Sequence, residues 1–227
     1  MFKSFLSVFA LSFLLTPKAM ALSFDADVPS AVQAQFQSDL AFINQVQGSG
    51  QTPLHQQIFG SVSGASYKKF FESRVVSVGL SECGGGGGVV ACVIPSVDPH
   101  KMWLTNNFVM ASIPMVARLM TIYHEARHTE AKNNHWDHAT CPVPFLDKNG
   151  KDILGIVSGV KMEGRPACDD TVFGSYGSST IMVKNLAKYC TNCNDKMKMD
   201  ATIWSDDQAK RLSNPLAAAQ LAKDFKN

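Results

Sequence analysis

The part of this sequence best suited to chemistry is a pair of histidines four residues apart, with a glutamate directly after the first. They are His124, Glu125 and His128, in the segment TIYHEARHTEA. On a helix, side chains four residues apart project from one face, so both imidazoles can bind the same metal ion. Zinc held in this way activates a water molecule, and the adjacent Glu125 can accept its proton as general base. The alternative is a solvated helix face that happens to carry two imidazoles.

Two histidines leave a zinc site incomplete, so a third protein ligand has to come from another part of the chain. The candidates are His135, His138, Glu163, Asp169 and Asp170. We prefer His138, because Asn133-Asn134 favours a helix end and the residues that follow span roughly 13 Å when extended. His135 follows that end too closely for the chain to return to the ion.

The first 21 residues have the layout of a secretory signal peptide. They contain Lys3, an apolar run at residues 5–15, Pro17 and the small-x-small tripeptide at residues 19–21. The apolar run is too short to cross a bilayer, and no later stretch approaches the roughly 20 apolar residues that a membrane helix needs. We therefore expect cleavage after Ala21 and an exported mature chain, either periplasmic or extracellular.

The mature chain carries no excess of either charge. The whole sequence has 21 Lys and Arg against 19 Asp and Glu, and removal of Lys3 and Lys18 leaves 19 of each. A formal charge near zero offers no case for nucleic acid or an anionic membrane as partner. We expect a peptide or protein substrate and a monomeric protein.

All six cysteines lie in the mature part, and an even number in an exported chain favours three disulfides. Proximity in the sequence favours the pairs Cys83–Cys92, Cys141–Cys168 and Cys190–Cys193. The last pair forms a CxxC, which could instead be redox-active or half of a zinc knuckle, although no second CxxC exists. A Cys141–Cys168 bridge would bring Asp169 near His138, which makes Asp169 the reserve third ligand.

Apolar periodicity and turn residues predict the secondary structure. Helices are expected at 30–47, 113–132, 178–190, 196–211 and 215–225, and strands at 75–78, 89–94 and 101–110. Residues 48–64 are predicted to be turn-rich. Five glycines after Cys83 indicate a hairpin tip before the strand at 89–94, closed by the Cys83–Cys92 bridge.

The HExxH helix, with a strand expected before it, resembles the zincin metallopeptidases, in which an edge strand holds an extended peptide substrate. The metzincin branch fits poorly, because Ala131 and Asn134 stand where its pattern has a glycine and a third ligand. A thermolysin-like site would need a glutamate on a later helix, and Glu163 has no clear helical setting.

The aspzincin or deuterolysin-like branch is more similar. There the HExxH motif is followed by GTxDxxYG, which supplies an aspartate ligand and a tyrosine. The segment ACDDTVFG could match with Asp170 as that aspartate, although Phe173 replaces the tyrosine and Gly-Thr is absent. Tyr176 in GSYGSS can take the place of the tyrosine, as a candidate stabiliser of the oxyanion. The resemblance covers residues 120–180 and is strong at five positions only.

These features predict one α+β domain over residues 22–227, with a zincin-like small mixed or antiparallel sheet, a long HExxH helix and a helix-rich C-terminal half. The expected function is that of a secreted zinc-dependent peptidase, with Zn²⁺ on His124, His128 and His138 and Glu125 as general base. One alternative is a zinc-dependent cell-wall or ester hydrolase that uses the same ion. The other is a non-catalytic secreted binding protein.

Overall fold

The computed structural model describes residues 22–84, 88–110, 113–130 and 136–226. The predicted signal peptide lies outside these residues, as do His135 and the pair Asn133-Asn134. Within the described part of the chain, no helix is both long and apolar enough to cross a membrane.

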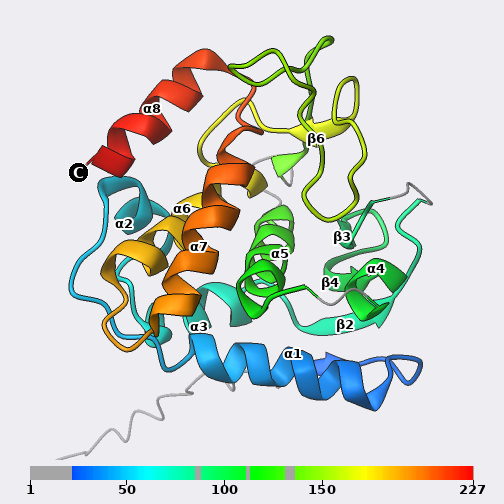
Figure 1. Cartoon of the computed structure of the whole chain (residues 1–227). Coiled ribbons are helices and arrows are strands. Elements are labelled where there is room, and N and C mark those ends of the chain that lie inside the picture. The colour runs from blue at the N-terminus through cyan, green and yellow to red at the C-terminus, as the bar shows by residue number, and fades with distance from the viewer. Residues whose placement is uncertain (1–21, 85–87, 111–112, 131–135, 227) are drawn as a thin grey trace, which may run out of the picture.

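Four strands form one mixed sheet, on the right of the view in Figure 1. In spatial order they are β1 (Ser23–Phe24), β2 (Ser77–Leu80), β4 (Asp98–Leu104) and β3 (Ala91–Ile94). Strands β1, β2 and β4 run parallel, whereas β3 runs antiparallel to β4 and forms an edge of the sheet. A second, two-stranded sheet pairs β5 (Ala139–Thr140) with β6 (Pro166–Cys168).

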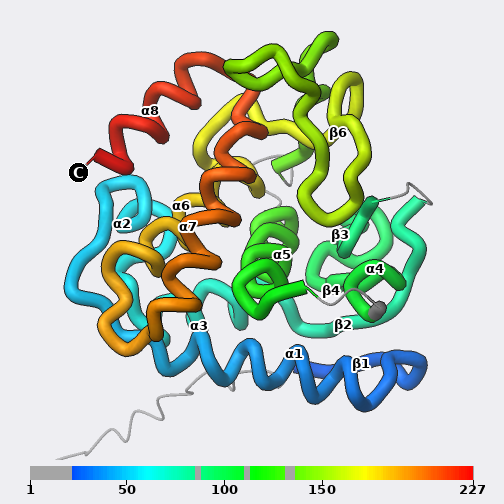
Figure 2. Tube along the Cα trace, viewed as in Figure 1, coloured from blue at the N-terminus to red at the C-terminus, as the bar shows by residue number. Residues whose placement is uncertain are grey.

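Helix α5 (Met115–His128) carries the HEARH segment and lies between the sheet and the C-terminal helices (Figure 1). It packs against β3 and β4 on one side and against α6 and α7 on the other. The remaining helices are α1 (Ser30–Ile43), α2 (Pro53–Phe59), α3 (Gly64–Glu72), α4 (Asn106–Met110), α6 (Ser175–Tyr189), α7 (Asp195–Ala209) and α8 (Pro215–Lys226). Figure 2 shows the chain passing from β1 into α1, which runs beneath α3 and the sheet in this view.

The buried face of α5 is held by aromatic packing. Tyr123 is fully buried, and its ring centroid lies 5.9 Å from those of Tyr67 and Phe70. Phe59 and Phe71 complete this cluster, each with its centroid 6.3 Å from that of Tyr123. Because Tyr123 directly precedes His124, the cluster from α2 and α3 fixes the rotation of α5 about its axis.

A buried ion pair joins α5 to α1. Asp39 of α1 is 1% exposed and accepts hydrogen bonds from Arg118, with Nε to Oδ2 at 2.6 Å and Nη2 to Oδ1 at 2.8 Å. Arg118 also donates from Nη1 to the carbonyl oxygen of Ile113 at 2.6 Å. This two-pronged contact places the first turn of α5 relative to the long helix beneath it.

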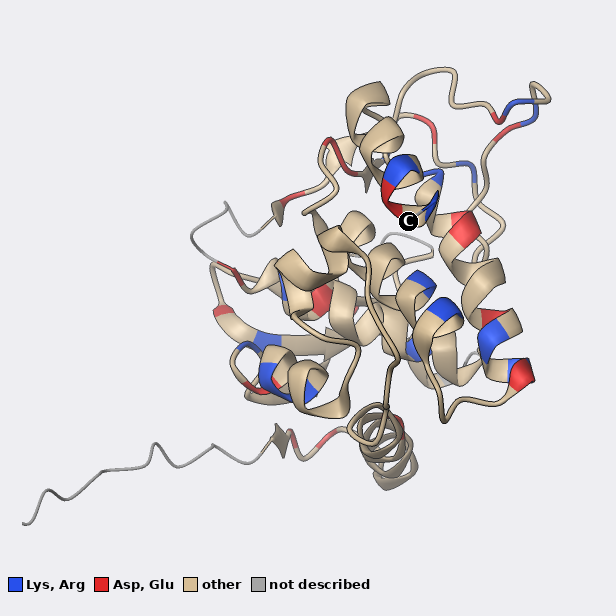
Figure 3. Ribbon diagram, turned by 90° about the vertical axis from the view of Figure 1, so that its left-hand side faces the viewer, with Lys and Arg blue, Asp and Glu red and all other residues tan. Residues whose placement is uncertain are grey.

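Charged side chains are spread over several helices and loops, and both signs occur on each side of the view in Figure 3. The distribution agrees with the near balance of 21 Lys and Arg against 19 Asp and Glu in the sequence.

The predicted mixed α+β architecture and the helix-rich C-terminal half are confirmed, and so are the three disulfides. The bridges join Cys83 to Cys92, Cys141 to Cys168 and Cys190 to Cys193. The predicted helices at 30–47, 178–190, 196–211 and 215–225 correspond to α1, α6, α7 and α8.

Two predictions about the strands were wrong. The expected strand at 101–110 ends at Leu104, because the hydroxyl oxygen of Thr105 accepts the Asn107 N–H at 3.1 Å and starts α4. The expected hairpin before residues 89–94 does not form either, since β4 lies between β2 and β3. The tight turn instead follows β3, where the Val97 N–H donates to the Ile94 carbonyl oxygen at 2.9 Å.

The helix predictions also needed correction at two places. The turn-rich interval 48–64 contains α2, whose first turn is capped by Thr52 and begins with Pro53. The HExxH helix, expected over 113–132, spans only Met115–His128. It ends early at Thr129, whose hydroxyl donates to the Ala126 carbonyl oxygen at 2.9 Å and so competes with the helical backbone bonds.

The Asp39–Arg118 pair gives a test of this packing. Asp39→Ala should lower the free energy of unfolding by about 3 kcal/mol, because it leaves a largely buried guanidinium without its counter-charge. The matched control is Lys68→Ala, which removes an exposed i,i+4 pair with Glu72 and should change that free energy by less than about 0.5 kcal/mol. Urea unfolding of both variants measures the difference. Equal changes in the free energy of unfolding would show that the Asp39–Arg118 pair does not hold α5 against α1.

Candidate metal centre

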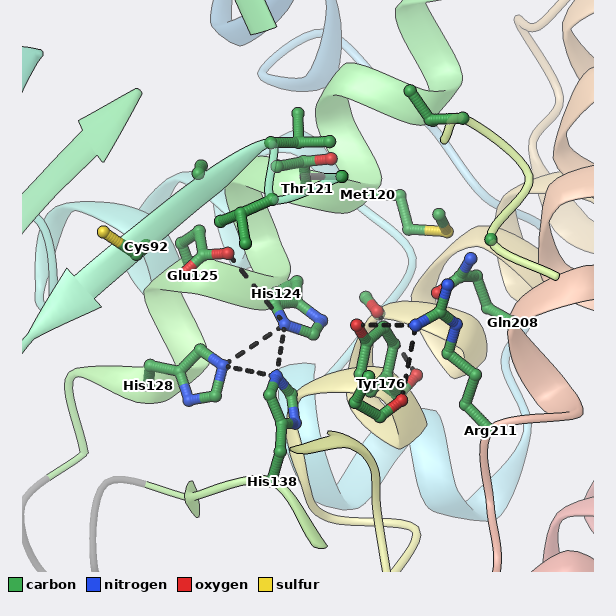
Figure 4. A pocket seen from close by; sticks show the side chains of 18 of the residues that line it. Cys92, Met120, Thr121, His124, Glu125, His128, His138, Tyr176, Gln208 and Arg211 are labelled. Atoms are coloured by element: carbon green, nitrogen blue, oxygen red, sulfur yellow. Dashed lines mark hydrogen bonds and ion pairs between the residues drawn. The ribbon is translucent and has the colours of Figure 1, made fainter. Parts of the chain in front are cut away.

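Three imidazole nitrogens converge at the C-terminal end of α5 (Figure 4). They are the Nε2 atoms of His124, His128 and His138, and each lies 3.2 Å from the other two. The first two come from consecutive turns of α5, as their spacing predicted. The third comes from the segment just before β5, so the structure brings the preferred third candidate to the pair.

This triangle fits a metal ion. Tetrahedral nitrogen ligands at the usual distance of about 2.0–2.1 Å from zinc lie about 3.3–3.4 Å apart, close to the spacing found here. Among the His, Cys, Asp and Glu side chains of the described residues, those of His124, His128 and His138 bring their ligand atoms close enough together to share an ion. The cluster can therefore hold a metal, while its geometry alone leaves the element open.

Burial favours the neutral form that a ligand needs. His124 is 8% exposed, and burial lowers its pKa well below the usual value, assisted by the neighbouring His128 and His138. A neutral imidazole presents a lone pair, whereas a protonated one cannot bind a cation.

Asp169 lies behind His138 and does not reach the triangle. Its Oδ1 lies 3.1 Å from Nδ1 of His138, the ring nitrogen opposite the converging Nε2. Because a carboxylate only accepts hydrogen bonds, this contact places the proton of His138 on Nδ1 and the lone pair on Nε2. The reserve ligand is thus positioned to orient the preferred one.

The GSYG segment explains how Asp169 is held. Its Oδ2 accepts the Gly177 N–H at 3.0 Å, in the first turn of α6, where the helix dipole favours a negative charge. A Cβ atom on Gly174 would lie 2.4 Å from this oxygen, so a larger residue there would displace the carboxylate. The backbone of Asp169 is fixed as well, through its N–H to the Arg211 carbonyl oxygen at 2.9 Å.

Glu125 is buried beside the triangle. Its Oε1 lies 3.9 Å from Nε2 of His124, and its Oε2 is buried without any hydrogen-bond partner in the described residues. Burial raises the pKa of this carboxyl to about 8, although a backbone hydrogen bond with Val93 lowers it. A buried acceptor left without a partner is unusual in a folded protein and indicates a place for a water or substrate group.

Tyr176 lies between the histidines and Arg211 (Figure 4). Its ring stacks on His138 with centroids 4.6 Å apart and meets the edge of His124 at 4.4 Å. Its hydroxyl oxygen accepts a hydrogen bond from Nη1 of Arg211 at 2.9 Å. Burial raises the pKa of Tyr176, and Arg211 opposes that shift, so the hydroxyl keeps its proton at neutral pH.

The triangle opens into a cleft of about 610 Å³, a volume typical of small-molecule and peptide sites. One wall is the strand β3 with the residues before it, and another is the loop at 155–158 within the segment closed by Cys141–Cys168. The end of α7 supplies a third wall through Trp204, Gln208 and Arg211.

The other candidate ligands lie elsewhere. His135 is outside the described residues. Asp170 is exposed and accepts a hydrogen bond from the Ser213 hydroxyl at 3.2 Å, and Glu163 is not part of the converging group.

Arg127 and Glu130, which flank the HEARH face, connect α5 to the surrounding loops. Arg127 donates to the Phe173 carbonyl oxygen at 2.8 Å and to Glu130 at 2.5 Å. Glu130 also accepts from Nε1 of Trp136 at 3.3 Å, which anchors the chain two residues before His138.

Sequence reasoning missed Arg211 and Gln208. Both are buried, at 8% and 5% exposure, and both line the cleft. A signal existed in the spacing of Trp204, Gln208 and Arg211, which continues the buried stripe of α7 with polar residues at positions where the pattern calls for apolar ones.

Comparison with known proteins adds no further assignment: no family model, curated protein or solved structure matches the chain.

The geometry predicts an order of metal affinities. His138→Ala removes one corner of the triangle, whereas Asp169→Asn keeps all three ligand atoms and alters only the contact behind His138. We expect a 10–100-fold loss of zinc affinity for Asp169→Asn, typical of such outer contacts, and a much larger loss for His138→Ala. Competition with a chromophoric chelator measures the affinity, and the rise in melting temperature on adding zinc provides a second readout.

His100→Ala is the matched control, because His100 is exposed and its ring forms a hydrogen bond with the Arg74 carbonyl oxygen, at 2.9 Å, away from the triangle. Its zinc affinity should equal that of the unaltered protein. A greater loss for Asp169→Asn than for His138→Ala would mean that Asp169 itself binds the metal.

Proposed function

We propose that this chain is an exported zinc-dependent peptidase in which Glu125 is the general base. The observation that carries the proposal is the triangle of three imidazole nitrogens, open to a cleft, with an unpartnered carboxylate oxygen beside it. Three protein ligands with a free fourth position are the usual arrangement of catalytic zinc, and imidazole nitrogens with tetrahedral spacing favour zinc among the common metals. The paired disulfides are compatible with an exported protein.

Bound at this triangle, zinc would supply a Lewis acid and lower the pKa of a coordinated water to about 7. Glu125 follows His124 in the sequence, and its free Oε2 can accept a proton from a nucleophilic water within the cleft. Once it holds that proton, the same carboxyl can pass it to the leaving amine as general acid.

Tyr176 can stabilise the negative charge that develops on the attacked carbonyl oxygen. Its hydroxyl oxygen already accepts from Arg211, so its own proton is left to donate. The stacked contact with His138 fixes the ring next to the metal triangle, which supplies the preorganisation that such stabilisation requires.

The free edge of β3 supports a peptide as substrate. The Val90 carbonyl oxygen accepts the Thr105 N–H at 3.1 Å, so the backbone N–H and C=O groups of Val90 point toward the end of β4. The direction of the backbone groups alternates along a strand, so the N–H and C=O of Ala91 point away from β4. The backbone of Val93, two residues later, points to the same side, where it forms a hydrogen bond with Glu125. Both residues line the cleft, where an extended peptide could pair with the main chain of Ala91.

This edge favours a peptidase over a zinc-dependent cell-wall or ester hydrolase, because a strand edge recognises the repeating N–H and C=O groups of a polypeptide. The expected small mixed sheet is present, but its edge strand beside the HExxH helix is β3, whereas β4, which corresponds to the strand expected before that helix, is internal. The resemblance to zincins still depends on the motif.

Glu125→Gln provides the test. The variant should keep one zinc ion per chain, since the three imidazoles are unchanged, but its rate of peptide hydrolysis should fall at least 10²-fold because the general base is lost. Zinc content by atomic emission and cleavage of a fluorescent casein and of a peptide library measure the two properties. The matched control is Glu163→Gln, which should retain both.

Hydrolysis that survives in Glu125→Gln would remove Glu125 from the mechanism. A zinc-loaded protein that cleaves esters but no peptides would support the ester hydrolase. The absence of any hydrolysis would favour a non-catalytic binding protein.

A further inference from the structure

Arg211 is a buried cation without a carboxylate partner in the part of the chain that the structure describes. It is 8% exposed, and no described Asp or Glu lies within ion-pair distance of its guanidinium. Removing such a charge from water without pairing it is costly. A buried arginine of this kind at a cleft therefore calls for an anion that arrives from outside the chain.

Within the described residues, the side-chain hydrogen bonds of Arg211 all come from one nitrogen of its guanidinium. Nη1 donates to the Tyr176 hydroxyl at 2.9 Å and to the Ala167 carbonyl oxygen at 3.3 Å. Among the described residues, no acceptor is found for Nε or Nη2. A Cβ atom placed on Gly155 would lie 3.6 Å from Nη2, so this nitrogen lies beside the part of the cleft wall that has no side chain. Nε and Nη2 form one of the two-pronged faces with which arginine binds carboxylates.

Both the backbone and the guanidinium of Arg211 are held by neighbouring residues. The Arg211 carbonyl oxygen accepts the Asp169 N–H at 2.9 Å, and its N–H donates to the Gln208 carbonyl oxygen at 2.9 Å. The guanidinium carbon also lies 4.5 Å from the centroid of the Tyr176 ring. A side chain fixed in this way loses little freedom when it binds a ligand, which favours recognition.

Its surroundings suit a small acidic group. Trp204 and Gln208 lie four residues apart on one face of α7, Arg211 follows just after the end of this helix, and all three line the cleft. The Tyr176 side chain lies between Arg211 and the metal triangle, because its ring contacts His138 and its hydroxyl contacts Arg211. A group bound here would lie close to the bond that is cleaved.

We propose that Arg211, with Gln208 beside it, binds a carboxylate of the substrate and so directs the site to peptides with an acidic group near the scissile bond. The proposal rests on the peptidase function argued above and assigns its substrate class. The carboxylate can belong to the C-terminus of a peptide or to an Asp or Glu side chain, and both present the same two oxygens to the guanidinium.

The test uses matched short peptides with blocked N-termini. One pair differs only in a free or amidated C-terminus, and a second, amidated pair differs only in Glu or Gln. With the zinc-loaded protein, kcat/KM should be about 10- to 100-fold higher for the acidic member of at least one pair, as expected for a hydrogen-bonded charge pair. The pair that shows the preference identifies the source of the carboxylate.

Arg211→Gln should abolish this preference, and Arg211→Lys should reduce it to a few-fold, because lysine keeps the charge but not the planar fork. The matched control is Arg165→Gln, which removes an exposed arginine from the rim of the same cleft and should keep the preference. Tyr176→Phe retains the guanidinium, so it should lower the rates for both members of a pair and leave their ratio unchanged.

Equilibrium binding separates this proposal from the peptidase function. The same peptides are titrated against zinc-loaded Glu125→Gln and against metal-free protein, followed by the change in tryptophan fluorescence. Metal-free protein that still binds the acidic member more tightly supports Arg211, because a carboxylate bound to zinc would lose its advantage there. Equal binding within both pairs, or a preference that survives in both Arg211 variants, would overturn the proposal, whether or not the protein hydrolyses peptides.

Discussion

The site depends on the buried carboxylate of Asp169. One of its oxygens contacts Nδ1 of His138, and the other accepts the backbone N–H of Gly177 at the start of α6. Asp169 also follows Cys168 directly in the sequence. The disulfide of Cys168 joins it to Cys141, which comes just after β5 and three residues after His138. A single side chain therefore connects the third histidine, the N-terminus of α6 and the disulfide-closed segment. This connection adds to the stacking of His138 on Tyr176 and to the Trp136–Glu130 hydrogen bond, which also hold the segment of His138 near α5.

Helix α5 combines two demands that ordinarily conflict. It is packed on nearly all sides, with Leu119, Ile122 and Tyr123 fully buried, yet it also buries His124 and Glu125. Buried ionisable groups destabilise a fold unless they are paired or neutral. Here both are kept neutral by their surroundings, since burial lowers the pKa of His124 and raises that of Glu125 to about 8. Burial of these groups therefore lowers the stability of the fold, but it also keeps His124 in the neutral form that can bind a metal ion.

Local patterns predicted the parts of the site that are close in sequence. The spacing of His124 and His128 was sufficient to place two corners of the histidine triangle, and the proximity of the cysteines gave all three disulfides. His138 was preferred on an argument about chain reach from Asn133-Asn134, but the described helix ends already at His128. The contact that positions His138 comes from Asp169, which spacing alone could only suggest as a competing ligand. For Arg211 the spacing with Trp204 and Gln208 could indicate a buried polar position, but its place in the cleft depends on how α7 packs against α5 and α6, which a local pattern does not reveal.

In the proposed peptidase, the pKa of Glu125 would connect metal binding to catalysis. At a pKa of about 8 the carboxyl is mostly protonated at neutral pH, and a protonated acid cannot act as a base. A divalent cation beside it favours the charged form and lowers that pKa, as a nearby positive charge does for any carboxyl group. The chain brings no lysine or arginine into ion-pair contact with Glu125 in its described residues, so within this part of the protein the metal is the positive charge available to the base. Occupation of the triangle by a cation would thus both create the electrophilic site and put its general base in the form that can work.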